Sequence, residues 1–386
     1  MDIETMISKI QVIKGDVLEP DLGISAADRK LITDNVSLIY HCAATIRFDE
    51  KLKKAIELNT RGTKLMIELA LECKKLDMFG YMSTAYCHLH ESFLLEKAYD
   101  PPTDPHKIMK SIELLDTDDV ELLATKILGN LPNSYAFTKA LAEALVNEAS
   151  EKKGLPAMIL RPSIVLPTYQ EPVAGWSDNL NGPTGLMIGS GKGVIRTIYC
   201  DEKSYGDFLP VDIAINGLMV CTWYYLTQND KENYIVNFTS SQDIQVRWEE
   251  IVMMGRKVLN DTYPINDILW YPGGDMTKYR FVHNIRAWDF DNKIGNRIRQ
   301  KLNKKEKIIY KCDAEGIDIY KYFENCTLGA RRYLLNQPDE RLPAARRMMT
   351  VMYCIDKLCK AFIYGGLIYW ISGLLLSLFF SEETLK

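Results

Sequence analysis

The chain has 386 residues, a length that predicts two or three domains and allows a large buried core. Hydrophobic residues make up 47% and charged residues 25%, which excludes a disordered chain, a collagen and a multi-pass membrane protein. The net charge of −4 argues against a dedicated nucleic-acid binder, whose domain is usually basic.

Strand and helix patterns alternate along the first half of the chain. Apolar runs predict strands at residues 9–16, 36–44, 78–86 and 156–165. Helical patterns cover residues 50–76, 116–128 and 134–154. This alternation is typical of an α/β fold with a doubly wound, Rossmann-type parallel sheet.

The second half of the chain is richer in loops and short helical patterns. Residues 166–193 are rich in glycine and proline, which predicts long loops. Residues 316–335 predict a smaller, helical C-terminal domain. The basic run 296–311 is open to three interpretations: contact with coenzyme A phosphates, contact with anionic lipid, or a solvated helix face.

Residues 361–380 contain no charged side chain. Twenty helical residues span about 30 Å, the thickness of a bilayer core, so the sequence predicts a C-terminal transmembrane helix. Basic residues precede this stretch, and by the positive-inside rule the body of the protein is expected in the cytosol. Neither the peroxisome nor the endoplasmic reticulum is favoured, because the final residues ETLK are not a peroxisomal signal.

The nine cysteines show no C-x-x-C spacing, and the sequence has only five histidines. We therefore expect free thiols and no metal site.

The pattern Tyr135-x-x-x-Lys139 lies near the start of the predicted helix 134–154. Positions i and i+4 share one helix face, and a nearby cation favours the phenolate and lowers the pKa of a tyrosine. Ser83 and Thr84 end a predicted strand, where open α/β sheets bind ligands. Asn59 precedes them on a helix that could face the same crevice.

The order of these parts resembles the extended branch of the short-chain dehydrogenase/reductases. The runs that narrow the resemblance are KGDVLEPDLG, YHCAATIRFDE, ELNTRGTKLM, YMSTAY, NSYAFTKALAE, LRPSIV, EPVAGWSDNLNGPTG, DFLPVD, WYPGGDMTKYRFVHNIRAW and DIYKYFENCTLGARRYLL. They resemble fatty acyl-CoA reductases over most of residues 10–340. The resemblance implies NADPH-dependent reduction of long-chain fatty acyl-CoA, through the aldehyde, to a primary fatty alcohol. It also implies a Rossmann-type domain at 1–245, a C-terminal domain at 246–345 and the membrane helix at 361–380.

The family's catalytic roles fall on four residues of this sequence. Tyr135 would be the general acid, and Lys139 would bind the nicotinamide ribose and lower the tyrosine pKa. Thr84, with Ser83 as second candidate, would hydrogen-bond the substrate carbonyl.

The same resemblance assigns the cofactor contacts. It places Asp16 and Val17 near the adenine, Ala43, Ala44 and Asn59 along the cofactor groove, and Pro162, Ser163 and Ile164 near the nicotinamide. For Asp16 the sequence equally allows a turn residue, and for the two alanines close packing.

The chain departs from the family at two places. It has no G-x-x-G-x-x-G turn, because its first glycine is Gly15, and Trp288 runs directly into Asp289 where the family carries an apolar stretch. We therefore expect an incomplete Rossmann sheet without the first two βα units, from a truncated gene model or splice variant, and an inactive chain. The alternatives are a non-catalytic remnant that binds acyl-CoA or a partner, and another extended reductase such as a sterol dehydrogenase or nucleotide-sugar epimerase.

Overall fold

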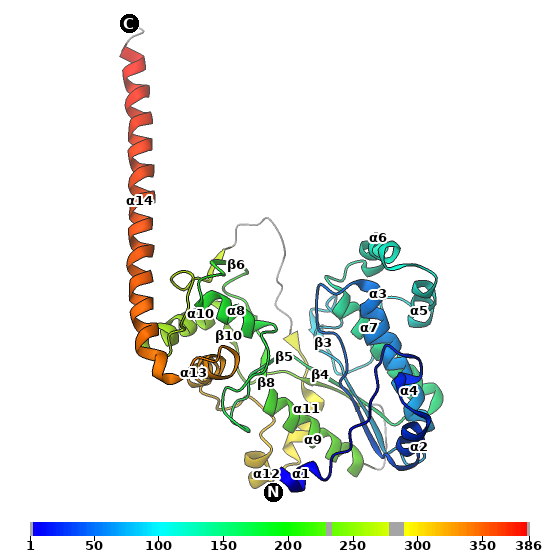
Figure 1. The fold of residues 1–386 in the computed structure, drawn as a ribbon. Helices are drawn as coiled ribbons and strands as arrows, with labels where there is room; N and C mark the ends of the chain where they lie inside the picture. The colour runs from blue at the N-terminus through cyan, green and yellow to red at the C-terminus, as the bar shows by residue number, and fades with distance from the viewer. Residues whose placement is uncertain (1–2, 229–233, 278–288, 384–386) are drawn as a thin grey trace. The chain divides into compact units, whose positions relative to one another are not determined.

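The computed structural model of the protein describes residues 3–228, 234–277 and 289–383 (Figure 1). The chain divides into two compact units. The first comprises Met1–Val165, Asp207–Gln245 and Ala287–Glu315, and the second comprises Leu166–Gly206, Val246–Arg286 and Gly316–Lys386. The predicted domains at 1–245 and 246–345 remain predictions.

The first unit contains a four-stranded parallel sheet. Its strands, in spatial order, are β1 (Leu38–His41), β2 (Met78–Met82), β4 (Ala157–Pro162) and β9 (Tyr234–Phe238). In register, Phe79 lies opposite Ala157, and Ile159 lies opposite Ile235. The predicted α/β fold with a parallel sheet is thus confirmed.

The remaining elements of the first unit are mostly helices. They are α1 (Ile3–Ile7), η1 (Pro20–Gly23), α2 (Ala26–Asn35), α3 (Leu52–Ala55), η2 (Ile56–Arg61), α4 (Gly62–Glu72), β3 (Phe93–Leu94), α5 (Pro105–Glu113), α6 (Thr117–Leu128), α7 (Ser134–Lys153), β8 (Phe208–Pro210), α9 (Val211–Thr227), β12 (Asp289–Phe290), α11 (Lys293–Gln300) and α12 (Lys304–Ile309). β5 (Ile164–Leu166) pairs with β8.

The second unit is built from helices and two-stranded ladders. Its elements are α8 (Pro183–Gly191), β6 (Thr197–Tyr199), β7 (Tyr205–Gly206), β10 (Val246–Arg247), α10 (Trp248–Lys257), η3 (Val258–Thr262), β11 (Asp275–Thr277), α13 (Ile319–Gly329), η4 (Ala330–Leu334), η5 (Asp339–Arg341) and α14 (Leu342–Glu383).

Helices cover both faces of the parallel sheet (Figure 1). Alternate side chains of a strand point to opposite faces. Phe79 and Tyr81 of β2 therefore pack on the side of α7, against residues such as Phe137. Met78 points to the other side, where α9 supplies Tyr225. Each such buried side chain contributes roughly 1.5–3 kcal/mol of hydrophobic stabilisation.

Helix α7 begins and ends at the residues that its sequence favours. The Asn133 side chain caps the first turn, accepting a hydrogen bond from the Ala136 amide at 2.8 Å. Gly154 takes the left-handed conformation, with φ 68°, that ends the helix at its expected place. The cap fixes the first turn of α7, and with it the backbone of Tyr135.

The predicted strand at residues 9–16 is wrong. This segment is irregular, and Ile10 and Val12 are 68% and 89% exposed. An apolar run forms a strand only where a neighbour pairs with it, and in the part of the chain that the structure describes this segment joins no sheet.

The predicted transmembrane helix at 361–380 is also wrong. Among the described residues, no helix combines the length and the apolar character needed to span a bilayer. The stretch belongs to α14, whose side chains are described only as far as Gly373. Residues 374–380 lie outside the described side chains, as do residues 278–288 of the WYPGGDMTKYRFVHNIRAW run.

Candidate active site

The predicted catalytic residues gather at the carboxyl edge of the parallel sheet. Ser83 and Thr84 follow β2, and Tyr135 and Lys139 lie on the first turns of α7. Ligands of open α/β sheets bind at this edge. The structure brings Thr84 to Tyr135, and it brings Lys139 to the last carbonyl of β2.

Tyr135 is half-buried, with its ring centroid 5.7 Å from that of Phe48. Burial raises the pKa of Tyr135 to about 12, and a hydrogen bond with the Thr84 side chain opposes this rise. The shift is opposite to the lowering that the sequence predicts. It keeps the phenol protonated at neutral pH, as a proton donor requires.

The Lys139 ammonium group is buried beneath the same edge. Its Nζ donates a hydrogen bond to the Met82 carbonyl at 2.7 Å and lies 4.9 Å from the centroid of the Tyr81 ring. Burial lowers the pKa of Lys139 to about 8. An ammonium has three donors, and the Met82 carbonyl is its one hydrogen-bond acceptor within the described residues. Two N–H donors thus remain for a ligand.

Two buried serine hydroxyls lie at the ends of neighbouring strands. Ser83 is 3% exposed and Ser163 is 5% exposed, and neither Oγ has a hydrogen-bond partner among the described residues. Their amides are paired, Ser83 with the Leu160 carbonyl at 2.7 Å and Ser163 with the Phe238 carbonyl at 2.8 Å. Because a buried hydroxyl without a partner is costly, this pair indicates a place where a ligand completes the hydrogen bonding.

Asn59 supports the loop that follows β1. Its Oδ1 accepts a hydrogen bond from the Thr45 amide at 2.8 Å. Its Nδ2 donates to the Thr45 carbonyl at 3.1 Å and to Thr138 Oγ1 at 3.0 Å. The amide therefore has both donors and one acceptor position in use, and its role as a cofactor ligand remains a prediction.

The adenine-side residues show local structural roles. Asp16 is exposed, and its Oδ1 accepts the Leu18 amide at 2.9 Å, as in a turn. Val17 packs against Gly62, and a Cβ added to Gly62 would lie 3.0 Å from the Cβ of Val17. Ala43 and Ala44 follow β1 and are exposed and half-buried. Their cofactor contacts also remain predictions, as do those of Pro162, Ser163 and Ile164.

A buried ion-pair network adjoins the site, and none of the sequence patterns described above predicted it. Arg161 of β4 binds both carboxylate oxygens of Glu143 on α7, at 2.8 and 2.6 Å. Arg161 Nη1 donates to the Leu95 carbonyl and Nη2 also donates to the Lys97 carbonyl, both at 3.1 Å. His88 Nε2 lies 3.1 Å from Glu143 Oε2. The network therefore ties a strand, a helix and a loop together next to the predicted catalytic residues.

The charges in this network stabilise one another. Burial disfavours the Glu143 carboxylate, yet Arg161 and His88 outweigh that effect and lower its pKa. Burial likewise disfavours a charged His88, but Cys87 and Glu143 raise the pKa of His88 to about 10. The spacing Tyr135, Lys139, Glu143 on one helix face is the sequence signal that would have revealed the carboxylate.

Cys87, His88 and Glu143 hold possible metal-ligand atoms within 4.8 Å of one another. Glu143 already has both oxygens bound by Arg161, which also brings a positive charge that opposes a cation. The atoms of this cluster are therefore better explained by an ion-pair network than by a metal site.

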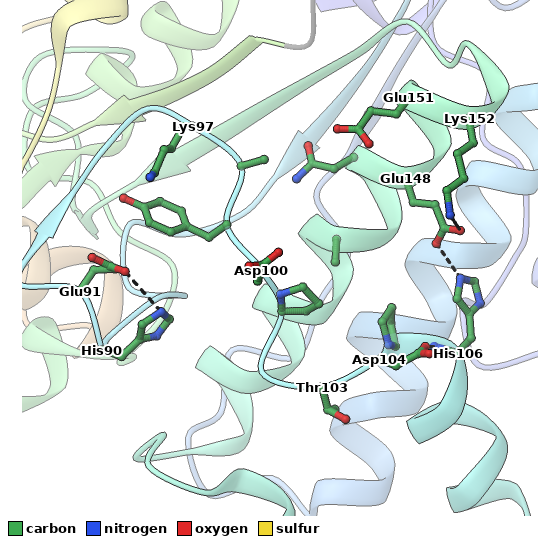
Figure 2. Close-up of a pocket in the computed structure, with 16 residues that line it drawn as sticks. His90, Glu91, Lys97, Asp100, Thr103, Asp104, His106, Glu148, Glu151 and Lys152 are labelled. Atoms are coloured by element: carbon green, nitrogen blue, oxygen red, sulfur yellow. Dashed lines mark hydrogen bonds and ion pairs between the residues drawn. The ribbon is translucent and has the colours of Figure 1, made fainter.

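A polar pocket of about 910 Å³ lies farther along α7 (Figure 2). Figure 2 shows its own ion pairs: His106 lies 2.7 Å from Glu148, which also binds Lys152, and His90 lies 3.6 Å from Glu91. The residues that line it include none of the predicted catalytic or cofactor residues. We therefore place the candidate active site at the sheet edge and not in this pocket.

Solved structures share the fold at low sequence identity. The terminal R domain from the myxalamid PKS-NRPS biosynthetic pathway aligns over 87% of this chain and 78% of its own, with a TM-score of 0.58 and 17% identity. A UDP-glucuronic acid 4-epimerase from Bacillus cereus in complex with NAD covers 86% of this chain and 84% of its own, with a TM-score of 0.53 and 17% identity.

Sequence comparison is more specific. Two family models described as male sterility protein, the first an NAD-binding model, match residues 1–218 and 277–337. Fatty acyl-CoA reductase 1 of Rattus norvegicus is 31% identical over 88% of this chain and 74% of its own length. Fatty acyl-CoA reductase 2 of Mus musculus is 30% identical over 90% of this chain and 76% of its own length. The chain belongs to the male sterility, or fatty acyl-CoA reductase, family.

Proposed function

We propose that this chain reduces long-chain fatty acyl-CoA to a primary alcohol through the aldehyde, with NADPH as reductant. The relatives named fatty acyl-CoA reductase and the NAD-binding family model support the reaction class. The observation that carries the proposal is that Thr84 meets Tyr135, and Lys139 reaches the last carbonyl of β2, at the same carboxyl edge of the sheet.

The residues at this edge fit the nicotinamide half of such a cofactor. The free donors of Lys139 suit ribose hydroxyls, and the unpartnered hydroxyls of Ser83 and Ser163 suit polar groups of the substrate and the nicotinamide. When bound, the cofactor would supply a hydride to the carbonyl carbon.

The chain's own residues neutralise the negative charge that develops on the substrate's carbonyl oxygen. Tyr135 stays protonated at neutral pH and donates its proton to the carbonyl oxygen as negative charge grows there. Thr84 orients the phenol, and the Lys139 ammonium stabilises the phenolate that remains. In the first reduction a hydride would add to the thioester carbon and a proton to its oxygen; collapse of this hemithioacetal breaks the C–S bond, returns the oxygen's proton to sulfur, and releases the aldehyde and coenzyme A as a thiol. Tyr135 would then take up a proton from solvent. In the second reduction a further hydride would add to the aldehyde carbon, and Tyr135 would protonate its oxygen to give the alcohol.

The Tyr135→Phe variant tests this assignment. We expect the full chain to turn over a long-chain acyl-CoA in the presence of NADPH. The turnover is measured by the loss of NADPH absorbance and by the formation of alcohol. The variant should lose turnover by at least about a hundredfold, the usual contribution of a general acid, and keep its NADPH-dependent thermal shift. Unchanged turnover in the variant would refute Tyr135 as the acid.

The alternative is a chain that binds acyl-CoA without turnover. The thermal-shift measurement separates the two functions, because a non-catalytic binder shows a thermal shift with acyl-CoA and none with NADPH.

A further inference from the structure

A strongly basic segment lies outside the catalytic machinery, at residues 293–311. It contains eight basic residues and one acidic residue, in a chain whose net charge is −4. The part that matters here is the group of exposed cations on α11, on α12 and between them. We refer to Arg297, Lys301, Lys304, Lys305 and Lys307 as the basic patch.

Among the described residues, the cations of the basic patch form no ion pairs with other side chains. Elsewhere in the segment, Arg299 pairs with Asp243 at 3.1 Å and Lys311 pairs with Asp313 at 2.9 Å. Within the described residues, none of the five patch cations lies within 4 Å of a carboxylate oxygen. Five unpaired positive charges on adjoining turns therefore attract an anionic surface.

Exposed apolar side chains accompany these charges. Ile308 is 80% exposed and Ile309 is 67% exposed, at the end of α12. Each isoleucine lies four residues after a lysine, Lys304 and Lys305, so that a cation and an apolar group share each helix face. A solvated helix face does not need two fully presented isoleucines.

The protein holds this turn rigidly. The Asn303 side chain caps α12, accepting hydrogen bonds from the amides of Lys305 and Glu306 at 2.9 and 3.0 Å. Leu302 before the helix and Cys312 after it are both buried in the core between the sheet and α9. The lysines and isoleucines therefore project from a fixed element and not from a loose loop.

We propose that α12 and the basic patch bind the surface of an anionic lipid bilayer. Lysine ammonium groups reach phosphate and carboxylate headgroups, and the isoleucines enter the boundary with the acyl chains. The long lysine side chains allow both contacts at once. The isoleucines decide between partners, because soluble phosphates or nucleic acid would engage the lysines and leave Ile308 and Ile309 in water. This surface binding is peripheral and independent of the proposed catalytic function.

Vesicle binding by the full chain tests the proposal. Cosedimentation would compare vesicles of phosphatidylcholine alone with vesicles containing 30% phosphatidylserine, at about 0.1 M and 0.5 M salt. Apolar side chains elsewhere, including those exposed on α14, act on both vesicle types. The difference between the two types therefore isolates the charge-dependent binding.

Two double variants and one control separate the contributions. Lys304→Gln with Lys305→Gln should lower the charge-dependent partition coefficient roughly twenty-five-fold, at about fivefold for each lysine. Ile308→Ser with Ile309→Ser should lower the total partition coefficient onto the phosphatidylserine vesicles at least about tenfold. The control, Lys110→Gln with Lys126→Gln, changes two exposed lysines of α5 and α6 and should leave it unchanged.

Specific results would overturn the proposal. Equal binding to both vesicle types, or unchanged binding by the lysine variant, would refute the proposal that the basic patch binds an anionic lipid surface. Unchanged vesicle binding by the isoleucine variant would show a purely electrostatic patch, suited to a soluble polyanion, a nucleic acid or an acidic protein. Circular dichroism of each variant checks that the exposed substitutions leave the fold intact.

Discussion

Loss of the Glu143 charge should destabilise this protein severely. In the Glu143→Gln variant the side chain keeps its size, but Arg161 loses its charged partner. Arg161 has no exposed surface and Glu143 is 1% exposed, so water cannot replace the missing carboxylate. The carbonyls of Leu95 and Lys97 would remain as the hydrogen-bond acceptors of the guanidinium.

The magnitude follows from the burial of the pair. Removing one partner of a buried ion pair costs about 3–5 kcal/mol of the free energy of unfolding, because the other charge is left uncompensated. Two well-formed bonds of 2.8 and 2.6 Å and the His88 contact favour the upper half of that range. The double variant Glu143→Leu with Arg161→Met should recover much of the loss, since an apolar pair of similar volume needs no compensation.

Urea unfolding of the three chains, followed by circular dichroism, measures these free energies. The matched control is Glu148→Gln on the same helix, where the carboxylate is about one-third exposed and pairs with His106 and Lys152. That change should cost less than about 1 kcal/mol. The reasoning fails if Glu143→Gln costs no more than Glu148→Gln, or if the double variant is less stable than Glu143→Gln alone.

Three further changes probe the titrating groups and the unpartnered hydroxyl. The pKa of Lys139 is held at about 8, below its ordinary value of 10.5, so the unfolded chain binds more protons between these values. Lys139 alone therefore contributes a rise of stability with pH across that window, which opposes the fall due to His88, and Lys139→Met should make the stability measured by urea unfolding fall more steeply above pH 8. The pKa of His88 is raised from 6.5 to about 10, so its contribution is complete below pH 6.5 and is lost as the pH rises to 10. His88→Gln should remove that decline, and a decline unchanged in the variant would exclude His88 as its source. Ser163→Ala should weaken NADPH binding by about 0.5–1.5 kcal/mol in a fluorescence titration without lowering stability, because its hydroxyl has no partner within the described residues.

The sequence was sufficient to predict the sheet because its central strands are continuous apolar runs. β2 and β4 are buried on both faces and lie inside the predicted strands 78–86 and 156–165. The run at 9–16 has only Ile10, Val12 and Ile13 as apolar residues, and it joins no strand in the described structure. A strand forms only where a second strand pairs with it, and the local sequence pattern does not show whether such a partner is present.

The arrangement of the candidate site was predictable where its residues are close in sequence. Tyr135 and Lys139 lie one turn apart, and the end of β2 places Thr84 beside Tyr135. The direction in which the pKa of Tyr135 shifts was not predictable. Burial is the largest cause of the shift, and the burial of a side chain depends on the whole fold. The partnership of Glu143 with Arg161 joins residues 18 apart on a helix and the next strand, and no spacing rule connects them.

One face of α7 therefore serves both the chemistry and the stability of the domain. Tyr135, Lys139 and Glu143 follow one another at intervals of four residues, so the ion pair that fixes Glu143 also fixes the rotation of the helix about its axis. A turn of the helix by one residue would move Lys139 away from the Met82 carbonyl and Tyr135 away from Thr84. Arg161, which enters from β4, would thus act as a positioning residue for the proposed proton donor, Tyr135, two helical turns away. The double variant that restores stability without the ion pair should on this reasoning fold well and yet turn over substrate more slowly than the parent chain.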